Sequence, residues 1–151
     1  MSKSWIRANI PPGQSLPEHG CLQLTHITNT GSVFGLLPNQ NSVLTVATII
    51  ILLLIPLFLR HLFVNYRYTV TGLAIVSLGL VMGGAIGNLI DRLRFHHVTD
   101  FIHVRLVNDF FWPAFNVADA SIVIGTLTLL FSLYRTGLFS RAYDPSRERG
   151  D

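Results

Sequence analysis

The sequence contains few charged residues and only one cysteine. Asp, Glu, Lys and Arg make up 13% of its 151 residues, whereas soluble domains contain about 25%. The single Cys21 excludes an internal disulfide and a cysteine-rich metal cluster. No basic cluster interleaved with aromatic residues is present, and the net charge is only +3, so we expect no nucleic acid partner. This composition favours a membrane protein.

Half of the residues are hydrophobic, and three long runs are almost free of charge. Since about 20 apolar residues in a helix cross a bilayer, the runs predict membrane helices at residues 42–59, 68–90 and 117–134. The length suits a single domain, which we assign to residues 1–134, followed by a polar tail at residues 135–151. The expected fold class is a mostly α-helical integral membrane protein with three transmembrane helices.

The segment at residues 1–41 contains no membrane-spanning run. Pro11, Pro12, Gly13 and Pro17 are expected to break any helix there. Weak alternation at residues 22–28 predicts a short strand, and Asn29-Thr30-Gly31 then predicts a turn.

A second strand is predicted at residues 98–106, where apolar and polar side chains alternate. Asp100 has the same parity as Val98, Ile102 and Val104. Because successive side chains of a strand point to opposite faces, its carboxyl should point with the apolar side chains. Such a position raises the pKa of a carboxyl, because burial disfavours its charged form.

The distribution of basic residues predicts the orientation in the membrane. Three crossings place a short polar loop, which contains Arg60, His61 and Arg67, on the same side as the tail. That side carries six arginines in short segments, whereas the other side carries five basic residues over much more chain. The positive-inside rule makes the first side cytoplasmic. Residues 83–119, which carry most of the polar candidates, should then face outward.

Asp100 and Asp119 are the leading candidates for chemistry, because both are expected at the same membrane face. Two adjacent carboxylates do not both ionise, so one keeps a proton. One can then activate a water as general base while the other polarises a peptide carbonyl. The alternatives are structural: Asp119 can form a capping box with Asn116 at the start of the third membrane helix, and Asp100 can be a solvated loop acid.

Other polar residues near the membrane helices also have structural interpretations. Asp91 and Arg92 can form an ion pair that anchors the second helix at the interface. Asn29, Asn88 and Asn116 can cap helices or stabilise turns. A stripe of glycines at four-residue spacing would let a neighbouring helix approach closely; its members are Gly79, Gly83 and Gly87.

A metal site is the third possibility. His96, His97, Asp100 and His103 have a spacing that could suit zinc if this segment were helical. The alternation favours a strand instead, and the sequence contains no HExxH motif. No metal or other cofactor is therefore expected.

Four ordered motifs carry a resemblance to a known family. They are Asn29–Gly35, Gly83–Arg92 with its Gly-Asn-x-x-Asp-Arg pattern, Val98-Thr99-Asp100-Phe101-Ile102, and Phe115-Asn116-Val117-Ala118-Asp119. In these motifs and their spacing, residues 1–134 resemble the lipoprotein signal peptidases, also called signal peptidase II.

The resemblance implies a four-helix aspartyl protease of the bacterial inner membrane with a small extracytoplasmic β-element. Such enzymes use no metal and cleave the signal peptide from diacylglyceryl-modified prolipoproteins, just before the lipidated cysteine. Membrane lipids and these prolipoproteins are the implied partners. By motif, Asp100 and Asp119 would be the catalytic pair, and four residues would line the substrate pocket: Asn29, Asn88, Arg92 and Asn116.

The chain departs from the family pattern at its beginning. The family starts with a membrane helix that ends in an Asp-containing motif closing with Lys, and Met1-Ser2-Lys3 resembles the end of that motif. The resemblance implies that the first membrane helix is missing from this sequence, either because the start codon is assigned too late or because the protein is a truncated form. Without that helix, nothing is expected to hold Lys3 at the outer surface. The alternative to an active protease is a truncated, inactive homologue that still binds lipopeptides.

Overall fold

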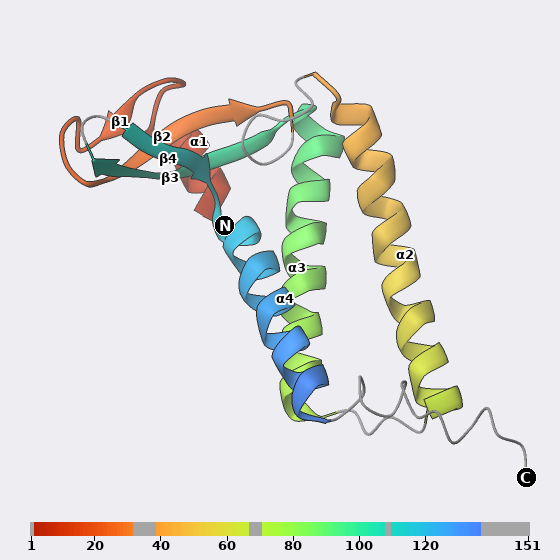
Figure 1. Cartoon of the computed structure of the whole chain (residues 1–151). Helices are drawn as coiled ribbons and strands as arrows, with labels where there is room; N and C mark the ends of the chain where they lie inside the picture. Colours follow the sequence, from red (N-terminus) through yellow and green to blue (C-terminus); the bar gives the residue numbers. More distant parts are fainter. Residues whose placement is uncertain (1, 32–38, 67–70, 108–109, 137–151) are drawn as a thin grey trace, which may run out of the picture.

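The computed structural model describes residues 2–31, 39–66, 71–107 and 110–136. Long helices stand beside one another, and a small sheet with one short helix lies at one end of them (Figure 1). Within the described residues, three helices are long and apolar enough to cross a membrane. The predicted fold class, a mostly helical membrane protein with a small β-element, is confirmed.

The three long helices are α2 (Asn41–Tyr66), α3 (Gly72–Phe95) and α4 (Val117–Arg135). The polar loop predicted after residue 59 is wrong at Arg60 and His61, because α2 continues through both. Falling hydropathy marks the end of the apolar run, but the backbone hydrogen bonds of a helix can continue beyond it. The first residues of the run predicted at 68–90 and the tail from residue 137 onward lie outside the described residues.

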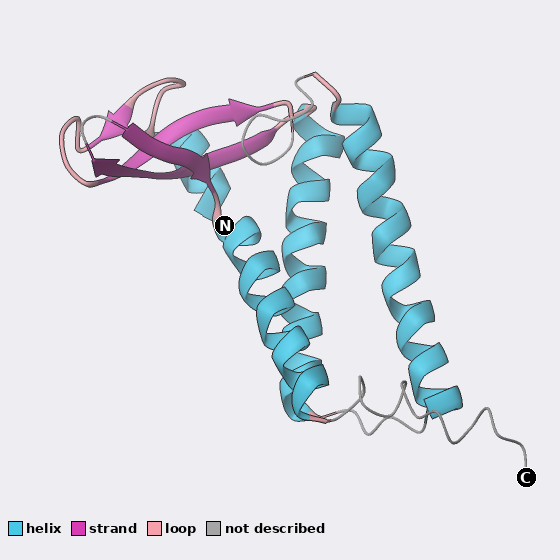
Figure 2. Ribbon diagram, in the orientation of Figure 1, coloured by secondary structure: helices cyan, strands magenta, loops and turns pink. Residues whose placement is uncertain are grey.

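The sheet is an antiparallel meander of four strands in sequence order among the described residues (Figure 2). Its strands are β1 (Ser15–Leu16), β2 (Leu22–Asn29), β3 (Val98–Val107) and β4 (Phe110–Phe115). The predicted strands at 22–28 and 98–106 are confirmed as β2 and β3. The sequence analysis missed β4, whose Pro113 argues against a strand, and the two-residue β1.

A short helix, α1 (Ser2–Asn9), precedes the sheet and was also missed. Pro11 and Pro12 follow it, so they mark the end of this helix rather than its absence. Ile6 and Ile10 are 2% and 1% exposed and pack against Phe101 of β3. This apolar cluster attaches the start of the chain to the strand that carries Asp100.

The close approach of α3 and α4 occurs at Gly84 and Gly125. A Cβ at Gly84 would collide with the backbone oxygen of Ala118, and a Cβ at Gly125 would lie 2.7 Å from the backbone oxygen of Ser77. The predicted glycine stripe meets α4 at Gly87, where a Cβ would lie 3.5 Å from the Cβ of Ala118, but a Cβ at Gly79 or Gly83 would meet nothing within 4 Å. Contact at Gly84 brings the first turn of α4 beside α3.

Candidate active site

The site is built around Asn116, the residue that begins α4. Its side-chain oxygen accepts hydrogen bonds from the backbone N–H groups of Ala118 and Asp119, at 2.8 and 3.2 Å. The carboxylate of Asp119 accepts in return from the backbone N–H of Asn116 at 3.0 Å. The capping box that the sequence suggested is therefore present, and it fixes the position of Asp119 in the first helical turn.

The second oxygen of Asp119 faces α3. It accepts a hydrogen bond of 2.8 Å from the side-chain amide of Asn88. Asp119 thus has one oxygen held by its own helix start and the other held by the neighbouring helix.

Asp100 reaches the same place from β3. Its two oxygens accept from the side-chain amides of Asn116, at 2.7 Å, and Asn29, at 2.9 Å. The oxygen of Asn29 meanwhile accepts from the backbone N–H of Gly31, which forms the predicted turn. Asp100 is only 3% exposed, so the interpretation as a solvated loop acid is wrong.

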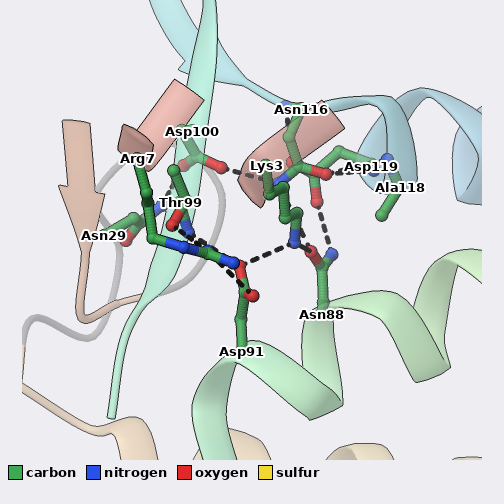
Figure 3. A network of polar contacts seen from close by, with 10 residues as sticks. All are labelled: Lys3, Arg7, Asn29, Asn88, Asp91, Thr99, Asp100, Asn116, Ala118 and Asp119. Atoms are coloured by element: carbon green, nitrogen blue, oxygen red, sulfur yellow. Dashed lines mark hydrogen bonds and ion pairs between the residues drawn. The ribbon is translucent and has the colours of Figure 1, made fainter. Parts of the chain in front are cut away.

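A single residue therefore joins the two acids. Asn116 donates its side-chain amide to Asp100 and its backbone N–H to Asp119. Figure 3 shows the two carboxylates on either side of it, with Asn88 below Asp119. The capping role that the sequence offered for Asp119 is therefore present, and it does not prevent Asp119 from sharing Asn116 with Asp100.

Burial raises the pKa of Asp100 to about 6. The hydrogen bonds from Asn29 and Asn116 and the charge of Lys3 oppose this rise, whereas the negative charge of Asp119 adds to it. The predicted direction of the shift is confirmed. A carboxyl with such a pKa exchanges its proton close to neutral pH, which suits general acid–base catalysis.

The raised pKa of Asp100 predicts a pH-dependent stability. The folded protein keeps this proton up to about pH 6, whereas an unfolded Asp releases it near 3.8. The folded state binds more protons between these values, so stability should fall as the pH rises through this window, by about 3 kcal/mol. Thermal unfolding in detergent should show this decline, and Asp100→Asn should lack it. Parallel curves for the two proteins would contradict the prediction.

A cavity of about 300 Å³ opens beside the two acids. Its polar end is formed by Asn29, Asn88, Arg92, Asp100 and Asp119. Its walls are apolar and come from the three long helices and β4, with members such as Leu44, Ile51, Val81, Ile122 and Phe115. Five of the six predicted site residues line this cavity, and Asn116, at 0% exposure, lies buried behind them.

The comparisons with known proteins agree with this geometry. The sequence profile described as Signal peptidase (SPase) II matches residues 1–135. The chain belongs to the signal peptidase II family. It is an enzyme of that family, a membrane aspartyl protease, and its helices make it a multi-pass membrane protein.

Individual relatives support the assignment to the signal peptidase II family. A lipoprotein signal peptidase of Moorella thermoacetica is 41% identical over 88% of this chain and 83% of the relative. One of Halothermothrix orenii is 37% identical over 89% of this chain and 86% of the relative. A solved bacterial membrane enzyme structure at 2.3 Å resolution superposes with a TM-score of 0.71 at 29% identity, covering 89% of this chain and 79% of that chain.

Asp91 and Arg92, both in the signal peptidase II motif, do not form the anchoring ion pair that the sequence suggested. Asp91 is 3% exposed and instead pairs with Lys3 at 3.0 Å and Arg7 at 3.2 Å, both in α1. Arg92 donates to the backbone oxygen of Gly31 at 3.3 Å. The expectation that nothing holds Lys3 is therefore wrong.

The sequence analysis of this signal peptidase II missed two features. One is α1, whose basic residues bind Asp91, and the other is β4, whose Trp112 and Phe115 line the cavity. Arg7 also donates to the hydroxyl of Thr99 at 2.8 Å and lies over the ring of Phe95. The basic residues of α1 were a visible signal, but the helix that carries them was not expected.

Two of the histidines weighed for zinc have structural roles in this signal peptidase II. His96 caps the end of α3 in a left-handed conformation with φ 62°, and the ring of His103 stacks on Phe111 at 4.3 Å. Across the described part of the chain, no group of three His, Cys, Asp or Glu side chains is placed to hold a metal ion.

Proposed function

We propose that this enzyme cleaves the signal peptide from diacylglyceryl-modified prolipoproteins on the N-terminal side of the lipidated cysteine, with Asp100 and Asp119 as its catalytic pair. The observation that carries this proposal is the joint hold of Asn116 on both acids, at 2.7 Å to Asp100 and 3.0 Å to Asp119. Two carboxyls beside one cavity can share a proton, as aspartyl proteolysis requires.

The chemistry follows from the two protonation states. The ionised carboxylate removes a proton from a water molecule, whose oxygen attacks the carbonyl carbon of the scissile peptide. The protonated partner donates a hydrogen bond to the carbonyl oxygen, which gains negative charge. The amide nitrogen then takes a proton as the C–N bond breaks, and the pair returns to its starting state.

The cavity supports the assignment of the substrate. Its polar end provides amide and guanidinium groups from Asn29, Asn88 and Arg92, which can bind the backbone of an extended peptide. Its apolar walls come from helices that are long enough to cross the membrane, so they can accept the hydrophobic part of a signal peptide and the diacyl chains. Prolipoproteins and membrane lipids are the partners that we assign.

The distribution of charge supports a location in the bacterial inner membrane with the site on the extracytoplasmic face. The sheet and α1 lie at one end of the long helices (Figure 1). Asp100 belongs to β3 of this sheet, and Asp119 lies in the first turn of α4. The opposite end leads to the arginine-rich tail, which the positive-inside rule assigns to the cytoplasm.

Cleavage of matched substrates tests this function. The purified enzyme is reconstituted in vesicles with one prolipoprotein that carries the diacylglyceryl cysteine and with the same protein lacking the modification. We expect cleavage of the lipidated form alone, with the new N-terminus at the modified cysteine as read by mass spectrometry. Equal cleavage of both forms, or a cut elsewhere, would contradict the assigned substrate. Binding of the lipidated form without cleavage would instead favour the inactive homologue.

A further inference from the structure

The side-chain amide of Asn88 has a defined orientation at the centre of the site. Its oxygen accepts from the ammonium of Lys3 at 2.7 Å and from the amide of Asn116 at 3.3 Å, while its NH₂ group donates to Asp119 at 2.8 Å. Figure 3 shows Lys3 above Asn88 on the side away from α3. The donors that bind the Asn88 oxygen therefore determine that the NH₂ group is the one that faces Asp119.

Lys3 is the stronger of the two donors to the oxygen of Asn88. An ammonium can only donate, so it cannot face the NH₂ group of an amide without repulsion. Its hydrogen bond is charge-assisted and short, which makes it about twice as strong as a neutral one. Asn116 lies farther from Asn88 and makes its shorter hydrogen bond to Asp100. A flipped Asn88 would place its NH₂ against two donors and its oxygen against the carboxylate of Asp119.

Lys3 is itself held in place. Its side chain is 12% exposed and pairs with Asp91 at 3.0 Å. Asp91 also accepts from Arg7 at 3.2 Å and from the backbone N–H of Thr99 at 3.0 Å. These contacts join α1, α3 and β3, so the ammonium group reaches Asn88 from a fixed position.

We propose that Lys3 is a positioning residue for the reaction: it holds the Asn88 amide in the orientation that presents its NH₂ group to Asp119. This inference rests on the proposed catalytic pair. Lys3 is not among the residues that line the cavity. Its positioning effect on kcat passes through Asn88, whereas its charge also acts directly on Asp100 and shows in the pH profile.

A double-mutant cycle tests the route of this effect. Lys3→Met, Asn88→Ala and the double variant are compared for kcat and KM with the full enzyme in vesicles on the lipidated substrate. Lys3→Met should lower kcat about 10- to 100-fold with little change in KM, because a misplaced group costs this much. In the Asn88→Ala background the same change should cost no more than about 3-fold, because its target is gone.

Arg7→Met provides the matched control. Arg7 lies in the same helix and pairs with the same Asp91, but it makes no contact with Asn88. A loss caused only by loosening of α1 would appear in both variants. We expect the effect of Arg7→Met on kcat to multiply with that of Asn88→Ala, whereas the effect of Lys3→Met does not.

The pH profile gives a readout that a purely structural role would not move. Lys3 lowers the pKa of Asp100, whereas burial and the charge of Asp119 raise it. The charge of Arg92 also interacts with Asp100. Removal of the ammonium should therefore move the limb of the pH–rate profile that follows Asp100 to higher pH. Lys3→Arg should return the profile and most of kcat, since it restores the charge and a donor.

The outcomes separate this inference from the proposed function. Full turnover after Asp100→Asn or Asp119→Asn would contradict the proposal that these two residues are the catalytic pair. Loss of turnover in those variants, together with multiplying effects of Lys3→Met and Asn88→Ala, overturns only the positioning role. If Lys3→Met does not fold, Lys3→Gln replaces it, because Gln keeps a donor without the charge, and its effect must likewise vanish in the Asn88→Ala background.

Discussion

Replacement of Asp100 or Asp119 with Asn should lower kcat for prolipoprotein cleavage by at least about 10⁴-fold, because an amide can neither take nor give the proton that the reaction moves. Each change also puts an NH₂ group where an oxygen now accepts. In Asp100→Asn it would face the amide of Asn29 or Asn116, and in Asp119→Asn it would face Asn88 or the backbone N–H of Asn116.

These two variants need a control that removes an acid elsewhere. Glu18 is exposed and lies outside the sheet and the cavity, so Glu18→Gln should leave kcat unchanged. Cleavage is followed as release of the signal peptide from a lipidated substrate, at equal amounts of membrane-inserted enzyme. Turnover above about 1% of the unaltered enzyme in either Asp variant would be far more than the loss of a catalytic acid allows.

Asn116→Ala should have the second largest effect, because it changes both turnover and stability. The variant loses the two cap hydrogen bonds at the start of α4 and leaves one oxygen of the buried Asp100 without its donor. Loss of a cap and of a buried partner together should cost about 2–4 kcal/mol of unfolding free energy. We expect kcat to fall about 10²- to 10³-fold, as for loss of an oriented donor.

Two further variants separate these effects. Asn116→Ser keeps a cap oxygen but cannot donate an amide to Asp100, so it should recover the part of the thermal stability that the cap supplies without recovering kcat. Thr71→Ala removes the cap of α3, where the hydroxyl accepts from the backbone N–H of Ala74 at 3.2 Å. It should lower the unfolding temperature and leave kcat unchanged. Recovery of turnover in Asn116→Ser would show that capping alone accounts for the role of Asn116.

The elements that hydropathy and alternation determine were predictable from the sequence. The apolar runs identified α2, α3 and α4, and alternation identified β3. Asp100 is buried as expected, but the parity argument for it was wrong, because Thr99 and Phe101 on the opposite parity are buried as well. Ends were less predictable, because α2 continues through Arg60 once its backbone hydrogen bonds are established. The register of helix packing was not predictable either. Gly84 and Gly87 face Ala118 of α4, whereas Gly79 and Gly83 do not.

The candidate site residues were predicted from motifs, but the residues that contact them could not be predicted from the sequence. Sequence spacing brings Asp119 and Asn116 together, because a capping box is local. It gives no information on the contacts of Lys3 and Arg7 with Asp91, which join residues more than eighty positions apart. Adjacent Asp91 and Arg92 suggested a pair, yet successive residues of a helix point in different directions.

The capping box also links the insertion of α4 into the membrane to the proteolytic activity of the enzyme. The hydrogen bonds that begin α4 are the same ones that hold Asp119 and orient the amide toward Asp100. If Asp100 and Asp119 are the catalytic pair proposed above, a nascent chain in which α4 has not yet formed its first turn should lack their alignment and should not cleave neighbouring proteins. Cleavage activity should then appear in a single step, when membrane insertion of α4 is complete.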